Sequence, residues 1–180
     1  VQVYEYSSGS WSQLGADIDG EAAGDLFGGS VSMSHNGNRV AIGAEENDGR
    51  TLEEGADRVY NNVGHVRVYE YSGGSWSQLG ADIDGEAAGD LFGISVSLDS
   101  DGDRVAIGAE ENDGGGSNAG HARVYEYSGG SWSQLGADID GESAGDLFGG
   151  SVSIDSDGSH VAIGAEENDG AGSNAGYVRD

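Results

Sequence analysis

A repeated segment constrains this chain more than any other feature. The stretch from Phe92 to Asp113 occurs three times, with copies at 27–48 and 148–169. Trp76 and Trp132 lie 56 residues apart, and residues 66–121 and 122–177 differ at eight positions. The first copy carries nine extra residues, all placed after Asp48. Self-similarity at this period predicts an array of equivalent supersecondary units.

Each period alternates apolar and small or polar residues in the manner of short strands. Four segments of the second period show this pattern: 93–99, 104–109, 121–127 and 131–139. Val105 and Ile107 fall on one face of the second segment, and Ala106 and Gly108 fall on the other. Alternation of this kind is typical of strands. Asp-Gly and Gly-Gly sequences predict the turns between them. The fold class is therefore predicted to be all-β.

The two faces of the predicted sheet differ in side-chain size. One carries Val, Leu and Ile, and the reverse carries Ser, Ala and Gly. A reverse face of small residues accepts the bulky face of an identical sheet, which is the packing of a radial array. The chain is thus predicted to form a β-propeller of four-stranded antiparallel blades. The expected units are a half-blade at 1–20, a blade at 21–85 with an insertion at 49–63, a blade at 86–141, and a half-blade at 142–180.

Three blades' worth of strands do not complete a circle, because propellers have about 4–8 blades. The simplest closure is a homodimer of six blades, in which the opening half-blade of one chain completes the closing half-blade of another. The alternatives are that the chain is a piece of a longer propeller, or a trimer of nine blades, which lies outside the common range. The near-identity of the copies also fits a recent amplification or an engineered origin.

The repeat resembles the FG-GAP repeat of integrin-α-like β-propellers. The resemblance lies in a Phe-Gly that opens a strand, a short turn, and a strand that ends Val-Ala-Ile-Gly-Ala. It extends over three copies and implies one four-stranded blade per period. Two features depart from the family: Glu-Glu follows the Gly-Ala in place of Pro, and the loop between the two strands is short.

In the calcium-binding members of that family, the same loop is longer and acidic. The residues at this turn in the three copies are Ser34, Asn36 and Asn38; Asp99, Asp101 and Asp103; and Asp155, Asp157 and Ser159. Because the acidic residues are not kept in every copy, we interpret them as Asx-Gly turn residues rather than as calcium ligands.

The net charge limits the partners that the chain can bind. Its 33 Asp and Glu residues against seven basic residues give a formal net charge of −26. Such a surface repels nucleic acid and anionic membranes and attracts cations. It also suits salty water, where self-repulsion is screened. We therefore expect an extracellular or secreted protein, with a saline or marine setting. No apolar run approaches the length that membrane insertion needs.

The links between blades carry four carboxylates in each copy, at offsets 1, 3, 5 and 9. They are Asp17, Asp19, Glu21 and Asp25; Asp82, Asp84, Glu86 and Asp90; and Asp138, Asp140, Glu142 and Asp146. This spacing partly matches the ligand positions of a calcium loop, so Ca²⁺ is the metal cofactor that it indicates. The glycine stands at offset 4 and offset 12 is not acidic, which favours the alternative that these carboxylates cap turns.

The sequence does not indicate a catalytic residue. His65 and His121 share one repeat position that becomes Tyr177 in the third copy, and His160 replaces Arg104. Such exchanges predict surface positions on strands rather than metal ligands or general bases. No serine lies in a Gly-x-Ser-x-Gly setting. Carboxylate pairs are so numerous that none is singled out for glycoside hydrolysis. We predict that the chain is not an enzyme.

The insertion at 49–63 breaks the symmetry and is the predicted ligand loop, with Arg50, Arg58 and Tyr60 as its candidate contacts. Long loops on rigid scaffolds commonly carry recognition; a tolerated insertion without a role is the alternative. The aromatic residues of the strands are expected to pack between blades rather than to bind sugars. The predicted function is a non-enzymatic binding or adhesion scaffold for a glycan or protein ligand. A purely structural or engineered self-assembling repeat, and a polysaccharide-active enzyme, are the alternatives.

Overall fold

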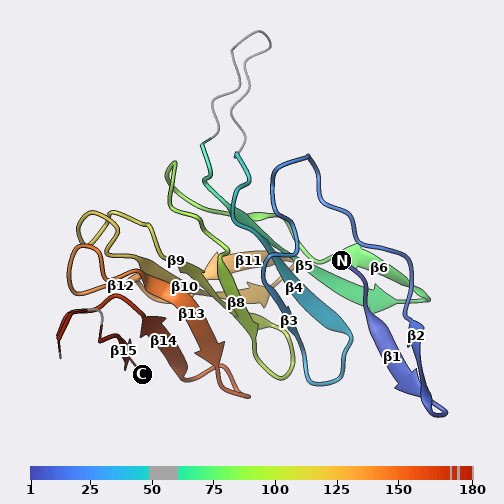
Figure 1. The fold of residues 1–180 in the computed structure, drawn as a ribbon. Coiled ribbons are helices and arrows are strands. Elements are labelled where there is room, and N and C mark those ends of the chain that lie inside the picture. Colours follow the sequence, from blue (N-terminus) through green and yellow to red (C-terminus); the bar gives the residue numbers. More distant parts are fainter. Residues whose placement is uncertain (49–60, 171, 174, 180) are drawn as a thin grey trace, which may run out of the picture.

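The fold was obtained as a computed structural model that describes residues 1–48, 61–170, 172–173 and 175–179. Within these residues every regular element is a β-strand, all strand pairs are antiparallel, and no helix occurs (Figure 1). The all-β prediction is therefore confirmed. The described part of the chain contains no helix with the length and apolar character needed to cross a membrane.

The strands form two full sheets with a smaller unit on either side. The N-terminal hairpin consists of β1 (Tyr4–Ser7) and β2 (Ser10–Gln13). The first sheet contains β3 (Val31–Met33), β4 (Arg39–Ala44), β5 (His65–Ser72), β6 (Ser75–Gln78) and β7 (Ile83–Asp84). The second contains β8 (Ser95–Leu98), β9 (Arg104–Ala109), β10 (His121–Ser128), β11 (Ser131–Gln134) and β12 (Ile139–Asp140). The C-terminal sheet contains β13 (Phe148–Ile154), β14 (Val161–Ala165) and β15 (Tyr177–Arg179).

The predicted fourth strand at 131–139 is wrong as one continuous element. It is divided into β11 and β12, which both pair with β10. Tyr125 lies opposite Gln134, whereas Ala122 lies opposite Ile139, so four residues of one strand face two of the other. Gly136, at the break, has a φ of +81°, a backbone angle that glycine adopts without a steric penalty.

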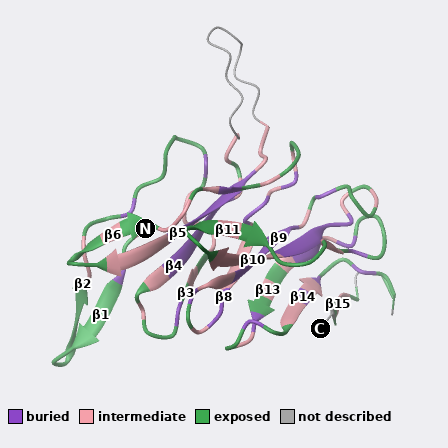
Figure 2. Cartoon of the chain, turned by 180° about the vertical axis from the view of Figure 1, so that it is seen from behind, coloured by how far each residue is buried: buried purple, intermediate pink, exposed green. Residues whose placement is uncertain are grey.

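The sheets stack face to face, with β3, β8 and β13 as neighbours along one side. One core cluster joins Ala41 and Val68 of the first sheet to Leu98, Val105 and Ile107 of the second. Figure 2 shows buried residues concentrated on the central strands β4, β5 and β9, whereas β1 and β2 are exposed. Because each sheet covers its neighbour's face rather than extending its edge, the stacking is that of propeller blades.

The predicted difference in side-chain size between the two faces of a sheet is present in its first two strands but not in its third. Val66 and Val68 belong to the same face as Ala41 and Gly43, because these residues are register partners across β4 and β5. The opposite face of β5 carries His65 and other polar residues next to the aliphatic residues of β4. The prediction of one bulky and one small face was therefore correct only for the inner strands.

The Phe-Gly pair fixes the start of each repeat. Phe92 and Phe148 are buried in the clusters between sheets. Gly93 has a φ of +94°, and its amide donates to the carbonyl oxygen of Gly108. A side-chain carbon at Gly93 would lie 2.8 Å from the carbonyl oxygen of His65. Only glycine fits this position, because both the backbone angle and the available space exclude a side chain.

Candidate functional site

The links between strands place an arginine between two carboxylates in the first sheet. Arg67 projects from β5 and donates through Nε and Nη2 to the two carboxylate oxygens of Asp82, at 2.9 and 2.8 Å. The same Nη2 also donates to Glu21, from the link that precedes β3. Arg67 is buried, with 8% of its surface exposed. This arrangement clamps two links of the chain onto one guanidinium.

The second sheet repeats the arrangement. Arg123 of β10 donates to Asp138 through Nε at 2.8 Å and through Nη2 at 2.7 Å, and it also pairs with Glu86. These hydrogen bonds lower the pKa of the Asp138 carboxyl and, together with Glu86, raise the pKa of the guanidinium. The ion pair is therefore fully charged at neutral pH.

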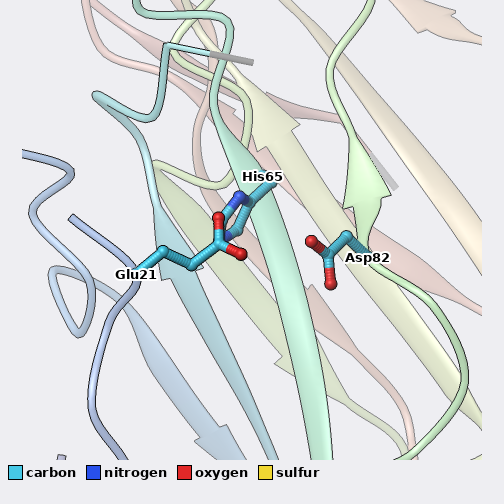
Figure 3. Close-up of side chains that lie close together, drawn as sticks. All are labelled: Glu21, His65 and Asp82. Carbon is cyan, nitrogen blue, oxygen red and sulfur yellow. The ribbon is translucent and has the colours of Figure 1, made fainter. Parts of the chain in front are cut away.

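A buried histidine lies beside each of these ion pairs. His65 comes near Glu21 and Asp82 with one ring nitrogen, and the three candidate ligand atoms lie within 4.8 Å of one another (Figure 3). His121 has the same surroundings in the second sheet. His65 is 2% exposed and His121 is 1% exposed, so the prediction of surface positions was wrong for both. Tyr177, at the same repeat position in the third copy, is half-buried.

Burial also fixes the charge of these imidazoles. Nε2 of His65 and both ring nitrogens of His121 have no hydrogen-bond partner. Desolvation lowers the pKa of each histidine, and the adjacent arginine lowers it further, although the carboxylates act in the opposite direction. Both rings are therefore neutral at pH 7.

These two clusters have the residue types of a metal site, but a guanidinium already neutralises their carboxylates. Both oxygens of Asp82 accept hydrogen bonds from Arg67. A divalent cation at His65 would face the positive charge of that arginine at close range, which disfavours binding. The chemistry that the arrangement supports is an ion pair that holds the links of a blade together.

The remaining carboxylates of the links have other partners. Asp25, Asp90 and Asp146 are buried, and each accepts a hydrogen bond from the side-chain amide of an asparagine. Asp146 also accepts the backbone amide of Ser143 at 3.0 Å. Asp84 and Asp140 end the short strands β7 and β12. The carboxylates of one link thus serve several separate contacts, and calcium binding by the four together stays a prediction.

The short turn between the first two strands uses its polar side chains as backbone caps. Asp99 accepts the backbone amide of Arg104 at 3.1 Å, and Ser34 Oγ accepts that of Arg39 at 3.0 Å. In the third copy Asp155 accepts the amides of Ser159 and His160. These bonds, with the His160 side chain, lower the pKa of Asp155. His160, Asp155 and Asp157 form a third group with candidate ligand atoms close together, and it is exposed to solvent.

Three equivalent glutamates gather where β4, β9 and β14 end. They are Glu45, Glu110 and Glu166, and together with Glu111 and Glu167 they form what we call the acidic rim. Burial raises the pKa of Glu110, and the charges of Glu166, Glu111 and Glu45 raise it further. Glu110 and Glu166 also line one pocket of about 490 Å³, so two copies of this position lie close together.

The predicted ligand loop lies largely outside the described residues, and Arg50, Arg58 and Tyr60 are among those not described. The role of the two β-strand arginines, Arg67 and Arg123, was not predicted from the sequence. Their position two residues after a histidine on a strand with Val on the other face was a usable signal, because it places both side chains on one face.

Stacked antiparallel sheets of two to five strands are consistent with propeller blades, and the comparisons agree at the level of the repeat. Residues 81–125 match the family model described as the FG-GAP repeat. The chain therefore contains an FG-GAP repeat, as the sequence resemblance implied. This matched segment begins between β6 and β7 of the first sheet and ends in β10.

The other comparisons add little. No curated protein matches the chain. Among solved structures, the chain is similar to hydrazine synthase from Kuenenia stuttgartiensis, with 16% sequence identity and a TM-score of 0.44. The similarity covers 83% of this chain and 44% of that one, so the present chain spans less than half the length of that structure.

Proposed function

We propose that this chain forms a non-enzymatic β-propeller scaffold that binds its ligand outside the cell. The observation that carries the proposal is the convergence of the acidic rim. Glu45, Glu110 and Glu166 hold the same repeat position in three different sheets, and Glu110 and Glu166 line one pocket. A rigid array that repeats one carboxylate position around an axis presents a concentrated negative field to cations and to cationic groups of a glycan or protein ligand.

The scaffold is proposed to close as a ring of six blades from two chains. The N-terminal hairpin has the third and fourth strands of a blade, and β13 and β14 have the first and second. Joining one to the other across two copies gives a complete blade at each junction. Two-fold closure of this kind is the common solution for self-complementary surfaces.

Calcium is the cation that we propose for the rim and the adjacent links, since carboxylate oxygens are its preferred ligands. A purely structural role is the second candidate. One observation favours it: Arg67 and Arg123 already form ion pairs with Asp82 and Asp138, two of the candidate calcium ligands of the links. A polysaccharide-active enzyme with its site in the central channel is the weakest candidate.

The test measures thermal unfolding of the 180-residue chain with CaCl₂ and with chelator, alongside an array of glycans and immobilised proteins. The proposal expects a higher melting temperature at low millimolar calcium. It also expects array binding that weakens in the triple variant Glu45→Gln, Glu110→Gln and Glu166→Gln. An unchanged melting temperature with chelator excludes calcium, and a silent array with an unaltered variant leaves the structural role. Hydrolysis of a glycan that carboxylate substitution abolishes would establish the enzyme.

A further inference from the structure

The surface of the first sheet that faces the N-terminal hairpin is incompletely covered. Leu98 in the second sheet is 7% exposed, whereas Met33, at the same repeat position, is 44% exposed. A groove of about 260 Å³ runs beside Met33 and is lined by Val1, Val3, Tyr4 and Val31, among others. These residues, with Trp11 on β2, form what we call the N-terminal face. A pair of strands from a preceding sheet would fill this groove.

The opposite end of the stack has a complementary gap. A side-chain carbon at Gly43 or at Gly108 would collide with a carbonyl oxygen of the next sheet. At Gly164, the third copy of this position, the nearest atoms belong only to Ser151 of the same sheet. Ser151 and Ser153 are exposed. Gly164, Ser151 and Ser153, together with Leu135 and Gly136, form what we call the C-terminal face.

A tryptophan contact at the outer edge of each interface between neighbouring sheets occurs twice within the chain and is absent at the N-terminal hairpin. Trp76 Nε1 donates to the carbonyl oxygen of Leu14 at 2.8 Å, and its ring lies 2.8 Å from where a side chain at Gly15 would begin. Trp132 contacts Leu79 and Gly80 in the same manner. Trp11 is the third member of this set and is 68% exposed. Its repeat-related acceptor is the carbonyl oxygen of Leu135, and a side-chain carbon at the adjacent Gly136 would meet no atom within 4 Å.

The inner strands repeat a second contact. Ser30 Oγ donates to the carbonyl oxygen of Gly93 at 2.6 Å, and Ser95 Oγ donates to that of Gly149 at 2.7 Å. The third serine of the set is Ser151, on the C-terminal face. The acceptor that the repeat assigns to it is the carbonyl oxygen of Gly28, at the start of the first sheet. The C-terminal face thus carries the serine donor, and the first sheet carries the carbonyl acceptor, of a hydrogen bond that occurs twice within one chain.

We propose that the C-terminal face of one chain binds the N-terminal face of a second copy through these same contacts. Trp11 Nε1 donates to the carbonyl oxygen of the partner's Leu135 and its ring covers the partner's Gly136. Ser151 Oγ donates to the carbonyl oxygen of the partner's Gly28. The proposal rests on the six-blade closure proposed above and adds the residues that make it. A second copy is the fitting occupant because the two faces are complementary to each other but lie at opposite ends of the stack, out of mutual reach.

The composite blade also continues a strand pairing. In the second sheet Tyr125 lies opposite Val105, and Glu126 lies opposite Arg104. The equivalent pairs are Tyr4 with Val161 and Glu5 with His160, drawn from two different chains. The glutamate of β1 then lies opposite the histidine, where the second sheet has an ion pair between Arg104 and Glu126 at 2.9 Å. The polar match supports this register.

The experiment is the solution mass of the purified chain by light scattering over a dilution series, with variants in matched pairs. The unmodified chain should have twice the mass of a single chain. Trp11→Ala and Gly164→Ala should weaken association about 10- to 100-fold, since an anchor is lost in one and a collision is introduced in the other. Their circular dichroism should stay that of the unmodified chain, because Trp11 is exposed and a side-chain carbon at Gly164 displaces only the hydroxyl of Ser151 in the single chain.

The controls are Trp132→Ala and Gly108→Ala, which alter the same contacts inside one chain and should lower the melting temperature. A dimer that Trp11→Ala and Gly164→Ala leave equally tight would overturn this inference while the closure stands. A chain of single mass at every concentration would overturn both, and would assign the two faces to another occupant.

Discussion

Trp132 donates its indole Nε1–H to the backbone carbonyl oxygen of Leu79 at 2.7 Å, across the boundary between two sheets. The contact joins β11 at the outer edge of one sheet to the residue that follows β6 in the preceding one. Trp76 makes the same bond to Leu14. In each case a glycine beside the acceptor leaves room for the ring. The tryptophan thus holds the outer parts of neighbouring sheets together, while the core holds the inner strands.

Replacing Trp132 with Phe should lower the free energy of unfolding by about 1 kcal/mol, because the ring contact is mostly kept and one hydrogen bond is lost. Trp132→Ala should cost about 2–3 kcal/mol, since the half-buried ring is lost as well. Urea denaturation checks both values. Trp11→Phe, measured where the chain is monomeric, should have no effect, and an equal loss at Trp11 would contradict the role assigned to Trp132.

Arg123 holds two links of the chain together, because it pairs with both Asp138 and Glu86. Arg123→Ala removes the partner of Asp138 and Glu86 and should lower the free energy of unfolding by about 1.5–3 kcal/mol, the range for hydrogen bonds to charged groups. Arg123→Lys should lose part of this, because an ammonium cannot reproduce the two-pronged contact. Thermal unfolding at low and high salt checks the order. A lysine variant as stable as the unmodified chain would show that charge alone matters.

The buried histidines should make the fold sensitive to mild acid. Their pKa values are lowered in the folded state, so between that lowered pKa and about 6.5 the unfolded chain binds more protons than the folded one. Stability is then complete above about pH 6.5 and falls as the pH drops below it. The double variant His65→Phe, His121→Phe should lose this part of the pH dependence.

Chemical denaturation at a series of pH values from about 7 to 5 measures the slope directly. The matched control is His35→Gln, which removes an exposed histidine and leaves both buried ones in place. The interpretation fails if the double variant keeps the slope of the unmodified chain. The carboxylates paired with arginine contribute at lower pH, since the pKa values of Asp82 and Asp138 lie below the usual range.

Strands and their stacking could be predicted from the sequence, because alternation shows which residues share a face and the repeat period shows which segments form equivalent sheets. Val105 and Ile107 alternate with Ala106 and Gly108, and the structure places the first pair in the core cluster that joins two sheets. The break at Gly136 was not predicted, because the residues on either side of it continue an acceptable strand pattern. Only the pairing with β10 reveals that two extra residues are accommodated there.

The ion pairs and the buried histidines were harder to predict, since both depend on contacts between segments far apart in the chain. Arg67 meets Glu21, 46 residues earlier. From sequence, the acidic links partly matched a calcium loop or served as turn caps, because the arginines that neutralise them lie on strands far away in the chain. His65 was expected at the surface because its exchange with Tyr is common there. Its burial follows from the sheet that covers β5, which no local pattern records.

A final prediction concerns β15, which competes with the second copy for the edge of β14. Val178 lies opposite Gly164 in the C-terminal sheet. In the full sheets the same position is held by Val66 opposite Gly43 and by Ala122 opposite Gly108. The repeat places Val1 of a second copy at this position too. Both valines cannot occupy it, so one segment has to leave when the composite blade forms.

The segment that leaves should be the one that buries less. Val178 is 67% exposed. Val1 is half-buried and packs against the cluster that contains Val3, Ile18 and Val40. Deleting residues 178–180 should therefore tighten association about tenfold, since displacing this segment costs on the order of 1.4 kcal/mol. Deleting 1–3 should weaken it, because part of the N-terminal face is lost. Dilution series by light scattering give both dissociation constants, and weaker association after deletion of 178–180 would mean that β15 belongs to the assembled blade.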